Sequence, residues 1–217
     1  RGEGAGMVLV KRLSDAQEDG DEPIAVIRGS CVNQDGRSSG LTAPNGPSQE
    51  RCIRTALENG NLKPHEVGYV EAHGTGTSLG DPIEAIAVGT VLKEGREPGH
   101  RFVLASAKTN LGHLEAAAGI SGLIKVCMVV QKGKIPPHLN WKSFNPMIDP
   151  EVLPITIPLK LQDWPAGYEK RIGAVSSFGF SGTNGHVICQ EPPPPRRTQE
   201  SEVRVAEPLV LSARSEK

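Results

Sequence analysis

The stretch VGYVEAHGTGTSLGDPIEAIAVGTVL, residues 67–92, indicates how the chain folds. Its first part, residues 67–72, is mostly apolar and has the length of a buried strand. His73 follows at once, and residues 74–80 form a loop of small residues. A strand, a glycine-rich turn and a helix in succession make up the basic unit of an α/β protein.

The helix of this unit has a marked start signal. Residues 81–84 read Asp-Pro-Ile-Glu. Asp is a favoured N-cap, Pro is favoured at the first helical position, and a Glu three residues after the cap can bond back to it. We therefore predict a helix that has Asp81 as its N-cap and ends at about Leu92.

Apolar runs and turn residues continue this alternation over the rest of the chain. Residues 14–22 are predicted to form an acidic surface loop, and residues 133–165 are rich in loops and prolines. The segment 113–131 is almost wholly apolar, which predicts a buried helix. The remaining predicted elements are strands at 7–13, 24–32, 67–72, 101–107, 171–177 and 186–190, and a helix at 48–59 with Ser48 as its N-cap.

The composition excludes several classes of protein. With 217 residues, the chain has room for one domain plus a tail, or for one part of a larger protein. Its 37% hydrophobic and 23% charged residues are typical of a globular protein rather than a disordered one. The longest apolar stretch, residues 119–130, contains Ser121 and Lys125 and is too short to span a bilayer. A net charge of −1 without a basic run argues against nucleic-acid binding.

The cysteines and the two ends of the chain indicate its setting. The four cysteines show no CxxC spacing, so we expect free thiols in a reducing cytoplasm. No signal peptide is visible in the first residues. We expect the sequence to be part of a longer chain. Residues 191–207 hold four consecutive prolines and a charged tract, which predicts a linker. Residues 208–215 turn apolar again, like the first strand of another domain.

Three glycine-rich segments each follow a predicted strand. They are residues 71–77 (EAHGTGT), 108–113 (KTNLGH) and 177–184 (SFGFSGTN). Ligands of α/β proteins bind at the carboxyl ends of strands, and glycine lets a substrate approach the backbone closely. These segments are therefore the candidate functional site.

Taken in order, the three segments closely resemble the β-ketoacyl synthases, or condensing enzymes, of polyketide synthases. The resemblance covers about residues 1–191 and extends to residues 40–47 (GLTAPNGP) and 136–141 (PPHLNW). Residues 209–214 (LVLSAR) resemble the start of the linker that leads to an acyltransferase domain, which favours a multidomain type I synthase. The expected divisions are the ketosynthase part at 1–191, a proline-rich linker at 192–207 and the start of the following region at 208–217.

The resemblance implies a thiolase-like α/β fold, layered αβαβα, and a centre of one cysteine and two histidines. The two histidines match His73 and His113. In the family the nucleophilic cysteine lies in a Cys-Ser-rich motif upstream of Arg1, and none of the cysteines at 31, 52, 127 and 189 has that context. The chain is therefore expected to be the C-terminal half of a ketosynthase domain and to be inactive alone.

The family's reaction explains why histidines are needed. An acyl group is bound to the cysteine as a thioester, and a malonyl-type extender arrives on the phosphopantetheine arm of an acyl carrier protein. When CO₂ leaves, the thioester oxygen gains negative charge, and two neutral imidazoles can donate N–H groups to it. The resemblance implies no directly bound cofactor and no metal. Without the surrounding motifs, His73 and His113 would be read as loop residues that cap backbone groups.

Lys108, five residues before His113, matches a family lysine. It is expected to be held by a carboxylate and to tune the electrostatics around His113. Many synthases carry a Glu nine residues after the second histidine, where this chain has Gly122. Asp81 and Glu84 are the candidate carboxylates instead, and helix capping alone would also explain them.

Three further residues match the family by position. Thr75 and Thr77 are expected to hydrogen-bond the phosphopantetheine arm, although turn chemistry would explain them as well. Phe178 is expected to gate the pocket with its ring and to contribute its backbone N–H to an oxyanion hole; the other interpretation is a core aromatic beside a glycine turn. His186 is expected to be structural.

The implied partners are an acyl carrier protein, the N-terminal half with the cysteine, a neighbouring acyltransferase domain and a second copy in a homodimer, without nucleic acid or membrane. A non-catalytic scaffold or dimerisation remnant of the same fold stays open, as does a condensing domain of the fatty acid synthase type. A thiolase would need a second cysteine near residues 177–179, where there is none. Spacing disfavours a metal site of three histidines (His73, His113 and His186) and a nucleotide site at residues 74–80.

Overall fold

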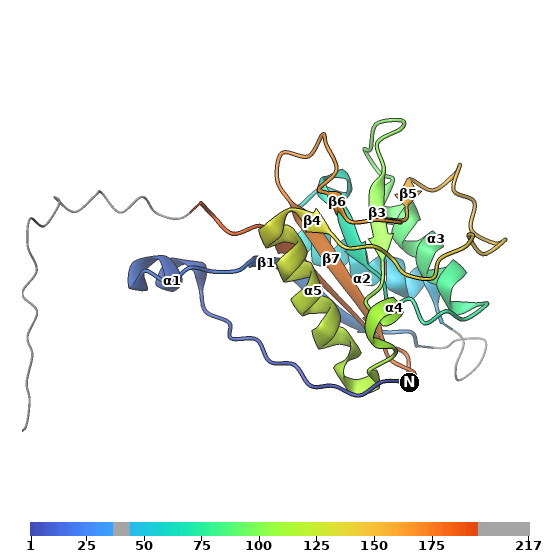
Figure 1. Cartoon of the computed structure of the whole chain (residues 1–217), viewed down its shortest axis with the longest axis horizontal. Helices are drawn as coiled ribbons and strands as arrows, with labels where there is room; N and C mark the ends of the chain where they lie inside the picture. Colours follow the sequence, from blue (N-terminus) through green and yellow to red (C-terminus); the bar gives the residue numbers. More distant parts are fainter. Residues whose placement is uncertain (37–43, 195–217) are drawn as a thin grey trace, which may run out of the picture.

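The computed structural model describes residues 1–36 and 44–194, which fold around a six-stranded and a two-stranded sheet (Figure 1). The predicted linker after residue 194 and the apolar run at 208–215 lie outside the described residues, as do residues 40–43 of the family-like segment. The helices are α1 (Leu13–Asp19), α2 (Gly46–Asn59), α3 (Gly80–Leu92), α4 (Lys108–Leu111) and α5 (Ala118–Lys132). The strands are β1 (Val26–Gln34), β2 (Tyr69–Glu71), β3 (Phe102–Ala105), β4 (Lys134–Ile135), β5 (Ile155–Thr156), β6 (Gln162–Asp163), β7 (Ile172–Phe178) and β8 (Thr183–Gln190).

The large sheet is mixed, with strand order β1-β8-β7-β2-β3-β5. β7, β2, β3 and β5 run parallel, whereas β8 is antiparallel to both of its neighbours. The predicted C-terminal hairpin is confirmed, with Ile172 paired to Gln190 at one end and Phe178 to Asn184 at the other. Because β2, β3 and β7 run the same way, the loops that follow them leave the sheet at one edge.

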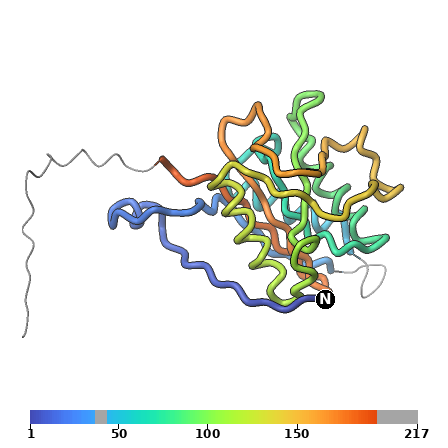
Figure 2. Tube along the Cα trace, viewed as in Figure 1, coloured from blue at the N-terminus to red at the C-terminus, as the bar shows by residue number. Residues whose placement is uncertain are grey.

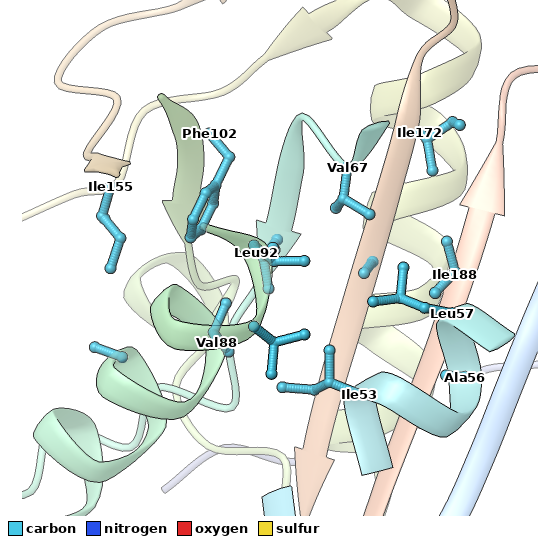
Figure 3. Close-up of a cluster of buried hydrophobic side chains, with 14 of the residues drawn as sticks. Ile53, Ala56, Leu57, Val67, Val88, Leu92, Phe102, Ile155, Ile172 and Ile188 are labelled. Atoms are coloured by element: carbon cyan, nitrogen blue, oxygen red, sulfur yellow. The ribbon is translucent and has the colours of Figure 1, made fainter. Parts of the chain in front are cut away.

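Helices cover both faces of this sheet. α2 and α3 lie on one face, where Ile53, Val88 and Phe102 are fully buried (Figure 3). α5 lies on the other face, where Val126 packs in the cluster that contains Tyr69. A buried side chain of this size stabilises the fold by roughly 1.5–3 kcal/mol. The described residues thus form three layers, αβα, in agreement with the predicted α/β class.

The start of α2 differs from the predicted one. Asn45 is the N-cap, and its side chain accepts a hydrogen bond from the Ser48 backbone N–H over 3.1 Å. Ser48 lies inside the first turn, fully buried, where its hydroxyl faces the Gln34 carbonyl over 3.3 Å. Both residue types are good caps, and the contact with the end of β1 draws Ser48 into the core.

The N-terminal segment was predicted wrongly. Residues 7–13 are not a strand, and the predicted acidic loop contains the short helix α1, which ends at Gly20 with a left-handed φ of 76°. The N-terminal segment passes the start of α5 and then runs away from it towards α1 (Figures 1 and 2). A Cβ on Gly6 would lie 2.9 Å from the Ile120 side chain, so glycine permits this close passage. An apolar run becomes a strand only where another strand pairs with it, and residues 7–10 pair with no strand and are largely exposed.

The helix predicted at 113–131 begins five residues later, as α5. Gly112 and Glu115 have left-handed φ values of 74° and 49°, which an α-helix does not contain, and residues 115–117 form a 3₁₀ turn. α5 is not buried all round, because Ile124 and Met128 are each 37% exposed. Among the helices of the described residues, none is long and apolar enough to cross a membrane.

Candidate active site

His73, His113 and Phe178 meet at the edge where β2, β3 and β7 end. His73 lies two residues after β2, and Phe178 is the last residue of β7. The chain leaving β3 passes through α4 before it reaches His113. The ring centroids of His73 and His113 are 5.5 Å apart at an interplanar angle of 85°, and those of His73 and Phe178 are 5.9 Å apart. The three rings line one cavity of about 1090 Å³.

Glu84 anchors the loop that carries His73. Its two carboxylate oxygens accept hydrogen bonds from the backbone N–H groups of His73 and Gly74, over 2.7 and 2.9 Å. The side chain is almost fully buried, and burial raises the pKa of Glu84 to about 7. Glu84 therefore fixes where His73 stands relative to α3.

Asp81 is not the N-cap of α3. The helix begins at Gly80 after Leu79, which offers no side-chain cap. Asp81 lies in the first turn and accepts a hydrogen bond from the Gly76 backbone N–H over 3.0 Å. The helix starts earlier than its best capping residue because the two carboxylates, Asp81 and Glu84, tie the preceding loop to its first turns.

Hydrogen bonds favour one neutral tautomer for each histidine. The Glu115 backbone N–H donates to His113 Nδ1 over 3.0 Å, which places the proton of the neutral ring on Nε2. Lys108 Nζ lies 3.5 Å from His73 Nδ1, and a protonated ammonium can only donate there. The two neutral rings therefore both carry an Nε2–H donor.

The electrostatics keep both rings uncharged. Burial first, and then the positive charge of Lys108, lowers the pKa of His73 to about 3. The same two causes lower the pKa of His113. Burial also lowers the pKa of Lys108, against the opposing charges of Glu84, Glu71 and Asp81. At neutral pH the site thus offers two N–H donors rather than two cations.

The expected contact of Lys108 with Asp81 or Glu84 takes a different form. Both carboxylates bond to backbone N–H groups of the His73 loop, and Lys108 faces His73 itself. Lys108 and Asp81 lie outside the lining of the cavity, whereas Glu84 lines it.

Thr75 and Thr77 lie at the cavity, on the turn between β2 and α3. Their hydroxyl oxygens are 3.3 Å apart, and that of Thr77 accepts from the Gly80 backbone N–H over 3.0 Å. Gly74, with a left-handed φ of 49°, lets this turn approach the β3 loop, because a Cβ there would lie 2.9 Å from Ser106 Cβ. The turn therefore depends on glycine for both its conformation and its packing.

His186 does not line the cavity and is fully buried on β8, where its Nδ1 is 3.0 Å from the Ser176 hydroxyl. The four cysteines are free thiols. In residues 1–36 and 44–194, no group of three or more His, Cys, Asp or Glu side chains could hold a metal ion.

Glu71, Tyr69 and Lys125 form a buried cluster behind the site that was not predicted from the sequence. The Glu71 carboxylate pairs with Lys125 Nζ over 2.8 Å and accepts from the Tyr69 hydroxyl over 2.6 Å. Two signals point to it: a lone carboxylate within a strand of apolar residues, and a lone lysine within an apolar helix. The pairing itself joins residues that are far apart in the sequence.

The fold is that of a ketosynthase, with the thiolase-like α/β architecture that the motifs imply. The ketosynthase from module 6 of the bacillaene synthase of Bacillus subtilis 168 matches with a TM-score of 0.81 and 39% identity, over 85% of this chain and 33% of that one. An oxazolomycin ketosynthase domain of Streptomyces albus matches with a TM-score of 0.79 and 38% identity, over 85% and 34%. This chain spans about a third of each of these solved chains.

The chain belongs to the β-ketoacyl synthase family, and the relatives that it resembles are polyketide synthases. Residues 24–142 match the family described as "Beta-ketoacyl synthase, C-terminal domain", and residues 145–217 match the "Ketoacyl-synthetase C-terminal extension". A phenolphthiocerol/phthiocerol polyketide synthase of Mycobacterium tuberculosis is 54% identical over 88% of this chain and 10% of its own length. The erythronolide synthase EryA3 of Saccharopolyspora erythraea is 44% identical over 99% of this chain and 7% of its own length. The chain thus spans about a tenth of such curated relatives.

Proposed function

We propose that this chain supplies the two-histidine part of a condensing centre that performs a decarboxylative Claisen condensation. The nucleophilic cysteine is supplied by a part of the ketosynthase domain outside these 217 residues. The observation that carries the proposal is the convergence of two neutral histidines, each with an Nε2–H donor, on one cavity.

In this reaction the bond between the malonyl carboxylate and the α-carbon breaks, and CO₂ leaves. The electron pair stays on the extender as an enolate whose oxygen accepts N–H bonds from His73 and His113. The enolate carbon then attacks the acyl-cysteine carbonyl, so that a carbon–carbon bond forms, the carbon–sulfur bond breaks and the thiolate departs. Lys108 acts behind the histidines, where its charge adds to burial in keeping them neutral.

The substrates reach the site on the phosphopantetheine arm of an acyl carrier protein. We assign Thr75 and Thr77 to contact with that arm, since their hydroxyls line the cavity beside His73. We assign to Phe178 the gate of the acyl pocket and, through its backbone N–H, part of the oxyanion hole for the acyl-cysteine. Polyketide rather than fatty acid extension is favoured by the relatives, which are polyketide synthases.

The proposed organisation follows the sequence. Residues 1–191 belong to the ketosynthase, residues 192–207 form a linker and residues 208–217 begin the region before an acyltransferase domain. The complete domain acts as a homodimer beside that acyltransferase.

The test is a condensation assay with acyl- and malonyl-carrier proteins, read by mass spectrometry. The complete synthase should form the β-ketoacyl product, whereas the 217-residue chain alone and the complete His113→Ala variant should not. Product from the chain alone would show that one of its own cysteines is the nucleophile. Absence of product from the complete unmodified synthase would favour the non-catalytic scaffold.

A further inference from the structure

A single buried carboxylate joins the two loops that carry the histidines. Glu71 ends β2, two residues before His73, and is 2% exposed. One of its oxygens accepts a hydrogen bond from the Ala107 backbone N–H, at the residue before Lys108 and α4. The other oxygen accepts from the Tyr69 hydroxyl over 2.6 Å and pairs with Lys125 Nζ over 2.8 Å. Glu71 thus bonds at once to the β3 loop and to α5.

α5 makes room for this carboxylate and supplies its counter-charge. A Cβ on Gly122 would lie 3.2 Å from Glu71 Cγ and 2.9 Å from Val175 Cγ2, so no larger residue fits there without displacing one of them. Lys125 lies three residues further along the helix, on the same face. Glu71, from the neighbouring strand, thus fills the space beside Gly122.

Stability alone gives little reason for such a pair. Burying two charges costs roughly what their attraction returns, and an apolar pair of similar volume would serve the core as well. The Tyr69 hydroxyl stays a donor at any moderate pH, since burial and the charge of Glu71 raise the pKa of Tyr69 well above 10. Two hydrogen-bond donors, on β2 and on the β3 loop, and one ammonium on α5 thus converge on one carboxylate.

We propose that Glu71 is a positioning residue for decarboxylation, held by Lys125 and Tyr69, which fixes α4 and thereby the place of Lys108 and His113 relative to His73. The inference rests on the proposed function of the histidines. Glu71 does not line the cavity and acts only through the residues that it holds.

The hydrogen-bond inventory makes the inference testable. A glutamine at 71 has one acceptor oxygen, so Ala107 and Lys125 compete for it in Glu71→Gln. Lys125→Met leaves the carboxylate buried without a cation. In the double variant, Glu71→Gln with Lys125→Met, the amide oxygen can accept from Ala107 without competition from an ammonium, and an amide N–H can donate to the Tyr69 oxygen.

The experiment measures CO₂ release from malonyl-carrier protein by the complete synthase. In each single variant kcat should fall by roughly ten- to a hundredfold, because small displacements of catalytic groups are costly. KM and the fraction of active sites that load a starter acyl group should stay unchanged, which a merely misfolded variant would not allow. The double variant should recover most of kcat. The matched control is Glu191→Gln, which breaks the Arg171–Glu191 pair at the other end of β7 and β8 and should leave kcat unchanged.

Unchanged kcat in Glu71→Gln, or a double variant as slow as the worse single one, would overturn the inference. A complete synthase that releases no CO₂ would instead refute the proposed function. Histidine NMR then still tests the tether, because the His73 and His113 ring signals should shift in Glu71→Gln and return in the double variant. Identical ring signals in all variants would overturn the inference.

Discussion

The ring of His73 lies edge-on to the ring of His113, with 5.5 Å between their centroids. One of these residues follows β2 and the other follows β3 and α4, so the pair exists only because two parallel strands end at the same edge. Lys108 and the Glu115 backbone N–H occupy the Nδ1 side of each ring. In the proposed function, the two Nε2–H groups serve one developing charge.

Lys108 should influence the pH below which decarboxylation slows. Its charge adds to burial in lowering the pKa of both histidines. Lys108→Met should therefore raise both pKa values, and the pH below which CO₂ release declines should move upward. Because burial remains the larger cause, that pH should stay below the ordinary histidine value of about 6.5. The pH–rate profile of the complete synthase measures this. Lys134→Met, which removes an exposed lysine paired with Asp163, is the control, and a profile that Lys108→Met leaves unmoved would refute the role.

Glu84 should stabilise the His73 loop through its two acceptor oxygens. Glu84→Gln replaces one acceptor by a donor, which faces a buried N–H group at a cost of about 1–3 kcal/mol. The folded-state pKa of about 7 lies above the ordinary 4.5, so the stability due to Glu84 is fully present below pH 4.5 and is lost as the pH rises through 7. The loss of unfolding free energy in Glu84→Gln should therefore become smaller as the pH rises. Denaturant unfolding at pH 6 and pH 8 measures this loss. The control is Glu94→Gln, which changes an exposed glutamate paired with Arg54 and should cost little stability. A deficit that grows with pH would contradict this.

Gly74 should be needed for the approach of the two loops as well as for its own φ of 49°. A left-handed conformation costs an L-residue roughly 1–2 kcal/mol, and Gly74→Ala adds a contact of 2.9 Å with Ser106. Gly99→Ala is the matched control, because Gly99 also has a left-handed φ and nothing lies near its Cβ. Denaturant unfolding should show Gly74→Ala as the less stable variant, with reduced CO₂ release. Equal stability of the two would show that the loops are not closely packed.

The isolated chain should expose an apolar surface beyond the roughly 300–600 Å² usual for a monomer. Met7 and Leu9 are 91% and 99% exposed on the N-terminal segment, which passes along α5. The chain alone should bind a hydrophobic dye or aggregate, and serine at positions 7 and 9 should weaken both. A monodisperse monomer that binds no dye and unfolds cooperatively would support a self-sufficient small domain.

The strand–loop–helix unit and the C-terminal hairpin could be predicted because their patterns are local. Their placement brings His73, His113 and Phe178 together, as the family resemblance implies, since parallel strands carry the motifs to one edge. Helix starts were less predictable. Asn45 and Ser48 are equally good caps by residue type, and only the buried contact of Ser48 with Gln34 decides between them.

The buried pair behind the site could not be predicted from local pattern. Glu71 and Lys125 belong to a strand and a helix whose packing the sequence does not state. The same holds for residues 7–10, whose apolar pattern suits a strand but which pair with no strand and are largely exposed. Both cases depend on which elements contact one another, and the periodicity of the sequence does not predict such contacts.

The most direct test of the account is a double-mutant cycle on CO₂ release from malonyl-carrier protein by the complete synthase. His73→Ala, His113→Ala and the double variant are compared with the unmodified enzyme. If both Nε2–H groups serve one oxygen, the losses should be strongly non-additive, with the double variant little slower than the worse single one. Additive losses, or a single variant that keeps full activity, would show that the two histidines do not act on the same charge.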